Sequence, residues 1–396
     1  MCNTDRETWI TGVGIVSALG EGPDAHWEAL DAGNVKVETA AFAPYIVHPL
    51  APVSFDAQIP KKGDQRQMEP WQRIGTYAAG LALDSAGAKG NAELLGRMDM
   101  IAAASGGERD LAADSAILVG LPKAVRQAPF LNERLMSVLR PTLFLAQLSN
   151  LLAGNISIVH GVTGSSRTFM GEEGAGVDAV RIAFARIRSG QSEIALVGGA
   201  QNSERKEMLL LYEFARFNLT GEFHPVWARR ERPGFALGSM GAFLVLESRS
   251  HAEARGATPV ARLAGVMSAR SDRKPGDVAV TLGRLWDEIA PERGKGGAVI
   301  SGATGVEPAT SEERAFLGNH PEFAVRATGT QLGHGVEPQF AMNIALAAMA
   351  VQRGALFASQ DATGFERAAD DALAQAVVTG VGHWRGEGLA LIEKID

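Results

Sequence analysis

The sequence predicts an α/β fold of two similar halves, with mixed sheets layered between helices. Short apolar segments alternate along the chain with longer segments of helical periodicity, as expected for strands that are covered by helices. A motif near the start, Ile10–Gly14 (ITGVG), returns near the end as Val378–Gly382 (VTGVG), which suggests a duplicated unit. The polar segment after Glu247 predicts a division into residues 1–250 and 251–396.

Local patterns predict the elements of the first half. Trp9–Val16 is an apolar run that ends in glycines, and residues 69–86 carry apolar side chains at helical spacing. The further elements expected up to residue 170 are a strand at Met98–Ala104, a helix over 140–153, and strands at 156–160 and 165–169.

A second amphipathic helix is predicted over residues 175–189. It places four apolar side chains on one face, namely Val177, Val180, Phe184 and Ile187, and Gly190 ends it. Strands are expected at Glu193–Val197 and Ala242–Leu246. This alternation of strand and helix supports the α/β assignment.

Composition excludes several functional classes. The net charge of -7 and the short Lys/Arg runs argue against a nucleic-acid partner. No apolar stretch approaches the roughly 18–20 residues needed to span a bilayer. The chain has one cysteine, Cys2, so an internal disulfide and a CxxC metal site are excluded, and a cytoplasmic location is the simplest expectation.

No cofactor and no metal are predicted. Gly12-x-Gly14 and Gly380-x-Gly382 lack the third glycine of a dinucleotide fingerprint, which favours tight turns at strand ends. The eight histidines show neither HxxxH nor HExxH spacing, which argues against a metal site. His160 is expected to be structural.

Four blocks in one order resemble the β-ketoacyl-acyl-carrier-protein synthases of the thiolase fold. They are Trp9–Gly20 (WITGVGIVSALG), Ala153–Gly164, Ile194–Ala200 (IALVGGA) and Pro225–Glu247, and His251–Gly256 continues the last. The resemblance covers nearly the whole chain. It implies a thiolase-like fold, a dimer formed through residues 150–200, and an acyl carrier protein as partner.

The same resemblance places Glu173 where the family carries its catalytic cysteine. Counting twenty residues forward from Ala153, or seventeen back from Gly190, ends at Glu173 without a gap. Condensation needs a thiolate, activated at a helix N-terminus, to take the acyl group from a carrier-protein thioester. A carboxylate suits the helix N-terminus electrostatically but cannot form the stable thioester.

Other catalytic positions of the family are also altered. Counting back five residues from Pro308 puts Ala303 at the first histidine, Gly329 falls on the lysine, and Val381 falls on the phenylalanine that gates the pocket. The second histidine is retained as His334. Because enolate stabilisation needs two donors, the loss at Ala303 leaves the oxyanion site half built. We therefore hypothesise that the chain alone cannot condense acyl groups.

Alternatives remain open for both site residues. Glu173 is interpreted as a structural replacement, with a new catalytic acid or base as the alternative. His334 is either a retained binding group or a structural hydrogen-bonded histidine. A stand-alone acyl transferase or decarboxylase that uses these two residues, and a non-catalytic carrier-protein scaffold, are the competing functions.

A closer resemblance is to the cysteine-less, chain-length-factor-like partner of a ketosynthase pair for very-long-chain fatty acids linked to lipid A. The segments that carry it are Ile46–Phe55, Ile59–Gln65 and His160–Glu173. It implies a heterodimer with a cysteine-bearing ketosynthase, with a homodimer as the alternative.

Two basic clusters are candidates for binding the acidic carrier protein. Lys61, Lys62 and Arg66 precede the helix at 69–86, where the family often presents basic residues. Arg229, Arg230 and Arg232 form the second cluster. Ordinary solvated surface charge is at least an equal explanation for either one.

Overall fold

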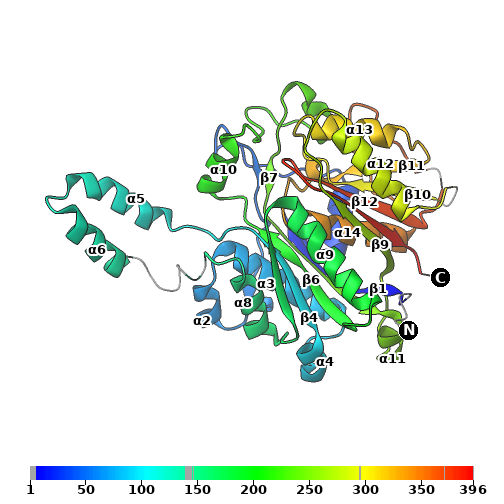
Figure 1. Ribbon diagram of the computed structural model, residues 1–396, viewed down its shortest axis with the longest axis horizontal. Coiled ribbons are helices and arrows are strands. Elements are labelled where there is room, and N and C mark those ends of the chain that lie inside the picture. The colour runs from blue at the N-terminus through cyan, green and yellow to red at the C-terminus, as the bar shows by residue number, and fades with distance from the viewer. Residues whose placement is uncertain (1–5, 139–144, 146, 294–295, 370, 396) are drawn as a thin grey trace.

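One mixed sheet of eleven strands runs through the computed structural model, which describes residues 6–138, 145, 147–293, 296–369 and 371–395 (Figure 1). The strand order is β11 (Phe323–Ala327), β10 (Gly297–Ser301), β12 (Gln375–Val381), β13 (Glu387–Glu393), β9 (Ala261–Ala269), β1 (Thr8–Ser17), β8 (Met240–Ser248), β6 (Ile194–Gln201), β4 (Asp99–Ala104) and β5 (Ser166–Met170). The short β2 (Gly20–Glu21) pairs with β1.

The strand order is symmetric about the junction of β1 with β9. On each side of this junction, the three outermost strands run parallel to one another. The two strands nearer the junction pair antiparallel with their neighbours. This symmetry confirms the prediction of two similar halves. This symmetry makes β12 equivalent to β6 and β1 equivalent to β9. The repeated motif lies in β1 (Ile10–Gly14) and at the end of β12 (Val378–Gly382), so it does not mark equivalent strands. The proposed division at residue 250 falls between β8 and β9.

Helices form layers on both sides of each half of the sheet (Figure 1). α9 (Glu172–Arg188) and α14 (Gln339–Arg353) contact strands of both halves and form the middle layer. The outer layers consist of α3 (Pro70–Ser85) and α8 (Leu151–His160) on the first half, and α12 (Asp277–Ile289) and α13 (Ala309–Gly318) on the second. The predicted layering of mixed sheets between helices is therefore confirmed.

The middle layer is the centre of the main hydrophobic core. The predicted apolar face of α9 is confirmed, because Val177, Val180, Phe184 and Ile187 are all buried. Gly176 lets α9 approach the loop before α14, since a Cβ atom there would lie 2.2 Å from the carbonyl oxygen of Glu337. The start of α9 is thereby fixed against the loop that carries part of the candidate site.

The glycines of β1 do not form the turn expected for them. Gly12 and Gly14 lie inside the strand, which continues to Ser17. A Cβ atom on Gly12 would lie 2.4 Å from the carbonyl oxygen of Ala82, and one on Gly14 would lie 2.1 Å from that of Ala78. These residues therefore allow close packing of β1 against α3.

The strand predicted at residues 156–160 is wrong, because this segment is the second half of α8. Leu152, Ala153, Ile156 and His160 are buried at helical spacing, whereas Ile158 is 73% exposed. Of the expected helix over 140–153, Leu145 and residues 151–153 are helical, whereas residues 147–150 are not, and 139–144 and 146 lie outside the described residues. The other predicted strands and helices are confirmed to within a few residues.

A helical hairpin projects from the body of the molecule on the left of Figure 1. It consists of α5 (Leu111–Gly120), η2 (Leu121–Lys123) and α6 (Gln127–Val138), and is called the arm below. The remaining elements are α1 (Gly22–Asp31), β3 (Val47–His48), η1 (Phe55–Ala57), α2 (Lys62–Gln67), α4 (Ala92–Arg97), α10 (Lys206–Glu213), η3 (Val226–Glu231), β7 (Leu237–Gly238), α11 (Arg249–Ala254) and η4 (Thr328–Thr330). Among the described helices none is both long enough and apolar enough to cross a membrane.

Candidate functional site

Glu173 lies in the first turn of α9, at the buried end of the middle layer. Only 4% of the residue is exposed. The turn into the helix is sharp: Gly171 has φ of 103° and Glu172, the first helical residue, has φ of 54°. Positive φ is unfavourable for a residue with a Cβ atom, so strain is localised beside Glu173. The helix N-terminus favours the negative charge of the carboxylate.

Two buried histidines converge on one oxygen of Glu173. Oε1 accepts a hydrogen bond from Nε2 of His334 at 2.7 Å and from Nδ1 of His383 at 2.7 Å. It also accepts one from the backbone N–H of His383 at 3.1 Å. His334 and His383 are 3% and 6% exposed. These three residues, called the Glu–His–His cluster, form a charge-assisted hydrogen-bonded group that is closed to solvent.

Backbone contacts fix the position of His334. Its N–H donates to the carbonyl oxygen of Ala236 at 2.7 Å, and its carbonyl oxygen accepts from the N–H of Gly238 at 2.9 Å. Gly333 precedes it with φ of 71°, and a Cβ atom there would lie 2.6 Å from the His48 ring. The Gly-His pair picked out in the sequence therefore has a structural reason for its glycine.

His383 is positioned by the bend that follows β12. The N–H of Gly382 donates to the carbonyl oxygen of Gly386 at 2.9 Å and closes this bend. A Cβ atom on Gly382 would lie 2.1 Å from the carbonyl oxygen of Arg385 and 3.2 Å from Oε2 of Glu173. Glycine at 382 thus leaves room for the Glu173 carboxylate.

Aromatic rings surround the two histidines. The ring centroid of Phe235 lies 5.1 Å from that of His334 and 5.4 Å from that of His383. The rings of Phe217 and Tyr212 lie 4.8 and 5.4 Å from His383, both edge-on. This shell keeps water away from the Glu–His–His cluster and lowers the local dielectric, which strengthens its electrostatic interactions.

The cluster shifts the pKa values of its members in opposite directions. Burial alone would raise the pKa of Glu173, but the charge of His383 and the hydrogen bonds from both histidines hold it well below the usual value. Burial disfavours the charged form of His383, yet the carboxylate of Glu173 raises the pKa of this histidine above its usual value. A carboxylate beside a protonated histidine is therefore the favoured state.

A second carboxyl group, Glu337, lies in the same environment. It is 3% exposed, and burial together with the negative charge of Glu173 raises its pKa to about 8. Among the described residues neither its Oε2 nor Oε2 of Glu173 has a hydrogen-bond partner. Sequence analysis missed both His383 and Glu337, because neither belongs to a motif and the fold alone brings them to Glu173.

Ala303, Gly329 and Val381, which the sequence predicts at other catalytic positions of the family, lie in a neighbouring group. Ala303 and Val381 belong to one apolar cluster, and a Cβ atom on Gly329 would lie 3.0 Å from the carbonyl oxygen of Ala303. Val381 is the last residue of β12, two residues before His383. The structure therefore brings His334 to Glu173 and places Ala303 beside Gly329. Neither of these two can supply a side-chain donor.

The basic clusters differ in exposure. Lys61, Lys62 and Arg66 lie at α2, and Lys62 forms an ion pair with Asp56 at 2.5 Å. Arg229 is 1% exposed and donates to the carbonyl oxygens of His224, Gly234 and Thr304. The interpretation of Arg229 as surface charge is wrong, because this side chain ties buried loops together, and burial lowers its pKa to about 9.

His160 is structural, as predicted. Its Nε2 hydrogen-bonds to the carbonyl oxygen of Thr76 at 2.8 Å and so joins α8 to α3.

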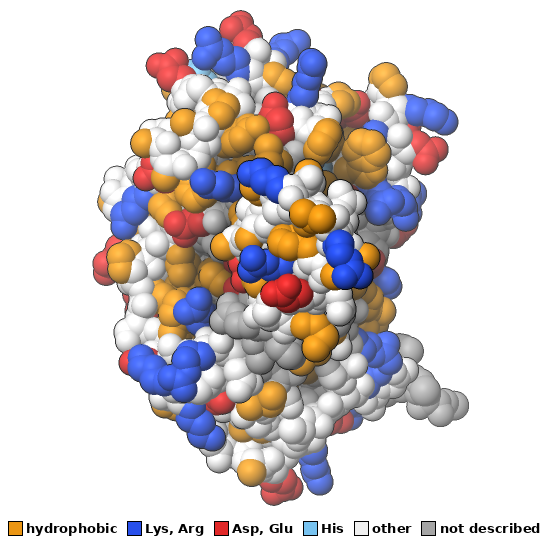
Figure 2. All heavy atoms as spheres, turned by 90° about the vertical axis from the view of Figure 1, so that its left-hand side faces the viewer, with side chains coloured by type: hydrophobic (Ala, Val, Ile, Leu, Met, Phe, Trp, Pro, Cys, Tyr) orange, Lys and Arg blue, Asp and Glu red, His pale blue; other side chains and the backbone are white. Residues whose placement is uncertain are grey.

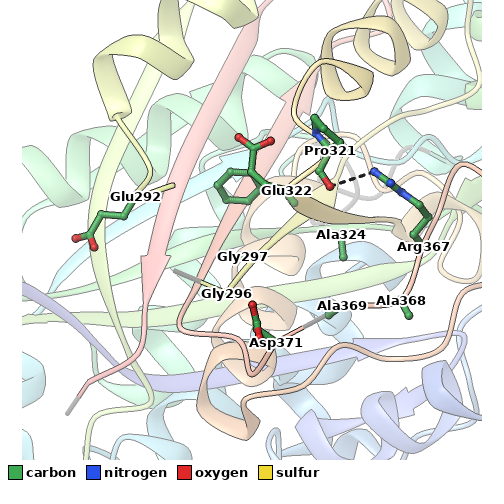
Figure 3. Close-up of a pocket in the computed structure, with 11 residues that line it drawn as sticks. Glu292, Gly296, Gly297, Pro321, Glu322, Ala324, Arg367, Ala368, Ala369 and Asp371 are labelled. Atoms are coloured by element: carbon green, nitrogen blue, oxygen red, sulfur yellow. Dashed lines mark hydrogen bonds between the residues drawn. The ribbon is translucent and has the colours of Figure 1, made fainter. Parts of the chain in front are cut away.

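A cavity of about 300 Å³ lies at the opposite end of β10 (Figure 3). Gly297, which lines it, is the first residue of β10, whereas the Ala303 group follows the last. Arg367 lines the cavity and donates to the carbonyl oxygen of Pro321 at 3.1 Å. Glu292, Glu322 and Asp371 also line it, and no member of the Glu–His–His cluster does. The cavity therefore has no part in the candidate site.

The chain has recognisable relatives among known proteins. The chain is 27% identical over 270 residues to 3-oxoacyl-[acyl-carrier-protein] synthase 2 of Vibrio cholerae, in a match that covers 66% of this chain and 62% of the relative. The aligned region therefore spans less than two thirds of that relative's length.

Solved structures show the same fold over almost all of the chain. The ishigamide ketosynthase/chain length factor superposes with a TM-score of 0.78 at 20% identity, covering 99% of this chain and 100% of that one. A type II PKS acyl-carrier protein in complex with its ketosynthase gives 0.78 at 16% identity, with 98% and 100% covered.

The model of one protein family, described as the N-terminal domain of β-ketoacyl synthases, matches residues 5–252, which is more than half of the 396 residues. The thiolase-like architecture inferred from the sequence is thereby confirmed, and the chain belongs to the β-ketoacyl synthase family.

Proposed function

We propose that this chain is a non-condensing subunit that pairs with a cysteine-bearing ketosynthase and helps to elongate acyl chains on an acyl carrier protein. The observation that carries the proposal is the state of Glu173. Position counting along the sequence puts its carboxylate where the family carries its nucleophile. Both histidines of the cluster donate to one of its oxygens. The structurally similar ishigamide ketosynthase/chain length factor is a pair of the kind that we propose.

The chemistry of the site opposes independent condensation. A carboxylate that attacked a thioester would give a mixed anhydride, which hydrolyses readily and does not store the acyl group as a thioester does. The histidine N–H groups that would stabilise an enolate oxygen already donate to Glu173. Ala303 and Gly329 offer no replacement donors from their side chains.

An apolar face supports the requirement for a partner. β5 is the last strand at its end of the sheet, and among the described residues no strand pairs with its outer side. An unpaired edge strand is a template for pairing with another chain. Large exposed hydrophobic side chains lie on β5 and on α8, which contacts it, and also on α10 and the arm. They are Met170 on β5, Ile158 on α8, Leu210 and Leu211 on α10, Phe214 after it, and Leu118, Val119 and Met136 on the arm.

Figure 2 views the molecule from the side of the arm, and hydrophobic and basic side chains share this face. Exposed apolar groups in such numbers indicate an interaction surface. We propose that β5, α8, α10 and the arm contact the cysteine-bearing ketosynthase, with a homodimer as the alternative.

The finer assignment rests on sequence resemblance. Ile46–Phe55, Ile59–Gln65 and His160–Glu173 resemble the degenerate partner in pairs that make very-long-chain fatty acids for lipid A. We propose that class of product, made in the cytoplasm, with no cofactor needed for the condensation itself. Mass spectrometry of the acyl products of the reconstituted pair tests the chain length.

Condensation assays test the proposal directly. The isolated chain is given an acyl carrier-protein thioester and malonyl carrier protein, and the same substrates are given to the pair. We expect product from the pair alone, and none when the partner's nucleophilic cysteine is replaced by alanine. Turnover by the isolated chain would instead support the stand-alone transferase or decarboxylase, and a pair no more active than the partner alone would support the scaffold.

Charge reversal at α2 tests carrier-protein binding. The double substitution Lys61→Glu and Lys62→Glu is expected to weaken binding of the acidic carrier protein by about 10-fold at low ionic strength, and by less as salt is added. Arg66 lies on the same helix and provides a third substitution. Lys274→Glu, at a residue whose side chain is 76% exposed in the other half of the chain, is the matched control. Unchanged affinity in the double variant would remove this patch from the interface.

A further inference from the structure

The Glu–His–His cluster holds together three groups that are common metal ligands. The ligand atoms of Glu173, His334 and His383 all lie within 4.8 Å of one another, and all three residues are buried. We propose that this cluster binds one divalent transition-metal ion, with Zn²⁺ as the best fit, at the position of the family's nucleophile. This inference does not depend on the identity of the partner subunit.

Two of the three distances between ligand atoms are shorter than those of a tetrahedral site, and the third, between the two imidazole nitrogens, is at most 4.8 Å. Bonds of about 2.0–2.1 Å from Zn²⁺ to nitrogen and oxygen place neighbouring ligands about 3.3 Å apart. The two contacts of His334 and His383 with Oε1 are both 2.7 Å, so each must lengthen by about 0.6 Å to admit the ion. His383 lies on the bend closed by the hydrogen bond between Gly382 and Gly386, which also carries the exposed Trp384.

The charges around the cluster also favour a cation. Oε2 of Glu173 is buried and has no hydrogen-bond partner among the described residues, so it is available as a further ligand. Oε2 of Glu337 is likewise buried without a hydrogen-bond partner among the described residues. The N-terminus of α9 opposes a cation. The carboxylate of Glu173 outweighs it, because a helix N-terminus is equivalent to only about half an elementary charge.

The donor set determines the class of metal. Two imidazole nitrogens and a carboxylate suit zinc and neighbouring transition metals, whereas Mg²⁺ and Ca²⁺ prefer oxygen ligands alone. The aromatic rings of Phe235, Phe217 and Tyr212 close the surroundings, which is typical of a structural rather than a catalytic site. Sequence motifs could not reveal this set, because His334 and His383 lie 161 and 210 residues from Glu173.

Metal binding by the purified full-length chain tests the proposal. The protein carries Cys2→Ser, which removes its only thiol, has no histidine tag, and is stripped with a chelator. Isothermal titration with Zn²⁺ is expected to give one ion per chain. Titration with Co²⁺ is expected to give the intense visible absorption of tetrahedral coordination, and zinc should raise the melting temperature.

Substitutions then locate the ion. Glu173→Gln and His383→Gln keep the side-chain volume and hydrogen-bonding capacity, so circular dichroism can verify that both variants fold. Each is expected to weaken zinc binding by at least about 100-fold, because losing even an outer-shell partner costs 10–100-fold. His224→Ala, at a partly exposed histidine outside the cluster, is expected to bind as the parent does. Failure of the parent to bind one zinc ion, or equal binding by all variants, would overturn the proposal.

Discussion

Replacing Glu173 with alanine is expected to lower the free energy of unfolding by about 3–5 kcal/mol, the usual cost of removing one partner from a buried charge pair. The carboxylate is the shared acceptor of His334 and His383, both of which are buried. Without it their N–H groups lose a charge-assisted hydrogen bond, and the aromatic shell offers no comparable acceptor. Urea unfolding followed by circular dichroism measures the difference.

Glu172→Ala is the matched control for this experiment. Glu172 lies in the same turn of α9, but its side chain is 28% exposed and its nearest cation, Nε of Arg385, is 3.5 Å away. An exposed ion pair contributes about 0–1 kcal/mol, so this variant should remain close to the wild type. Equal losses in the two variants would contradict a special role for Glu173.

Substitution of Glu337 by glutamine is expected to make the protein more resistant to alkaline pH. Burial and the charge of Glu173 raise the pKa of Glu337 to about 8 in the folded protein, above the ordinary value of 4.5. The folded state therefore holds this proton more tightly than the unfolded state does. The resulting stabilisation is fully present below the unfolded pKa and is lost as the pH rises through the folded one.

Glutamine resembles the protonated acid and does not titrate, so the Glu337→Gln variant should escape this loss. The stability of the wild type relative to the variant is expected to fall by on the order of 3 kcal/mol between about pH 5 and about pH 8. Other buried groups titrate in both proteins, so their contribution cancels in this difference. They include His26 and His48, whose pKa values burial lowers. A difference that does not change with pH would show that Glu337 is not a buried acid.

The sequence predicted the arrangement of the core well because packing patterns are local. The four apolar residues of α9 recur at helical spacing, and burial of that face follows from its periodicity. Position counting within the family-like blocks singled out Glu173, and the Gly-His pair singled out His334. The structure then joined these two residues directly.

Features that depend on contacts between distant segments could not be predicted from the sequence. His383 reaches Glu173 only because β12 ends beside the start of α9. Arg229 belongs to a basic run that resembles exposed charge, yet three backbone carbonyls keep it buried. Residues 156–160 have the apolar composition of a strand, but packing of α8 against α3 makes them helical. In each case tertiary contacts outweigh local preference.

The most direct test of the central claim is a native mass spectrum of the chain co-expressed with a cysteine-bearing ketosynthase from the same genome. We expect a one-to-one heterodimer. Met170→Asp should abolish it, because Met170 is 66% exposed on the edge strand β5 and burying an unpaired charge there in the interface is costly. A spectrum that contains only homodimers, with no mixed species, would contradict the assignment of this chain as the partner subunit of a ketosynthase pair.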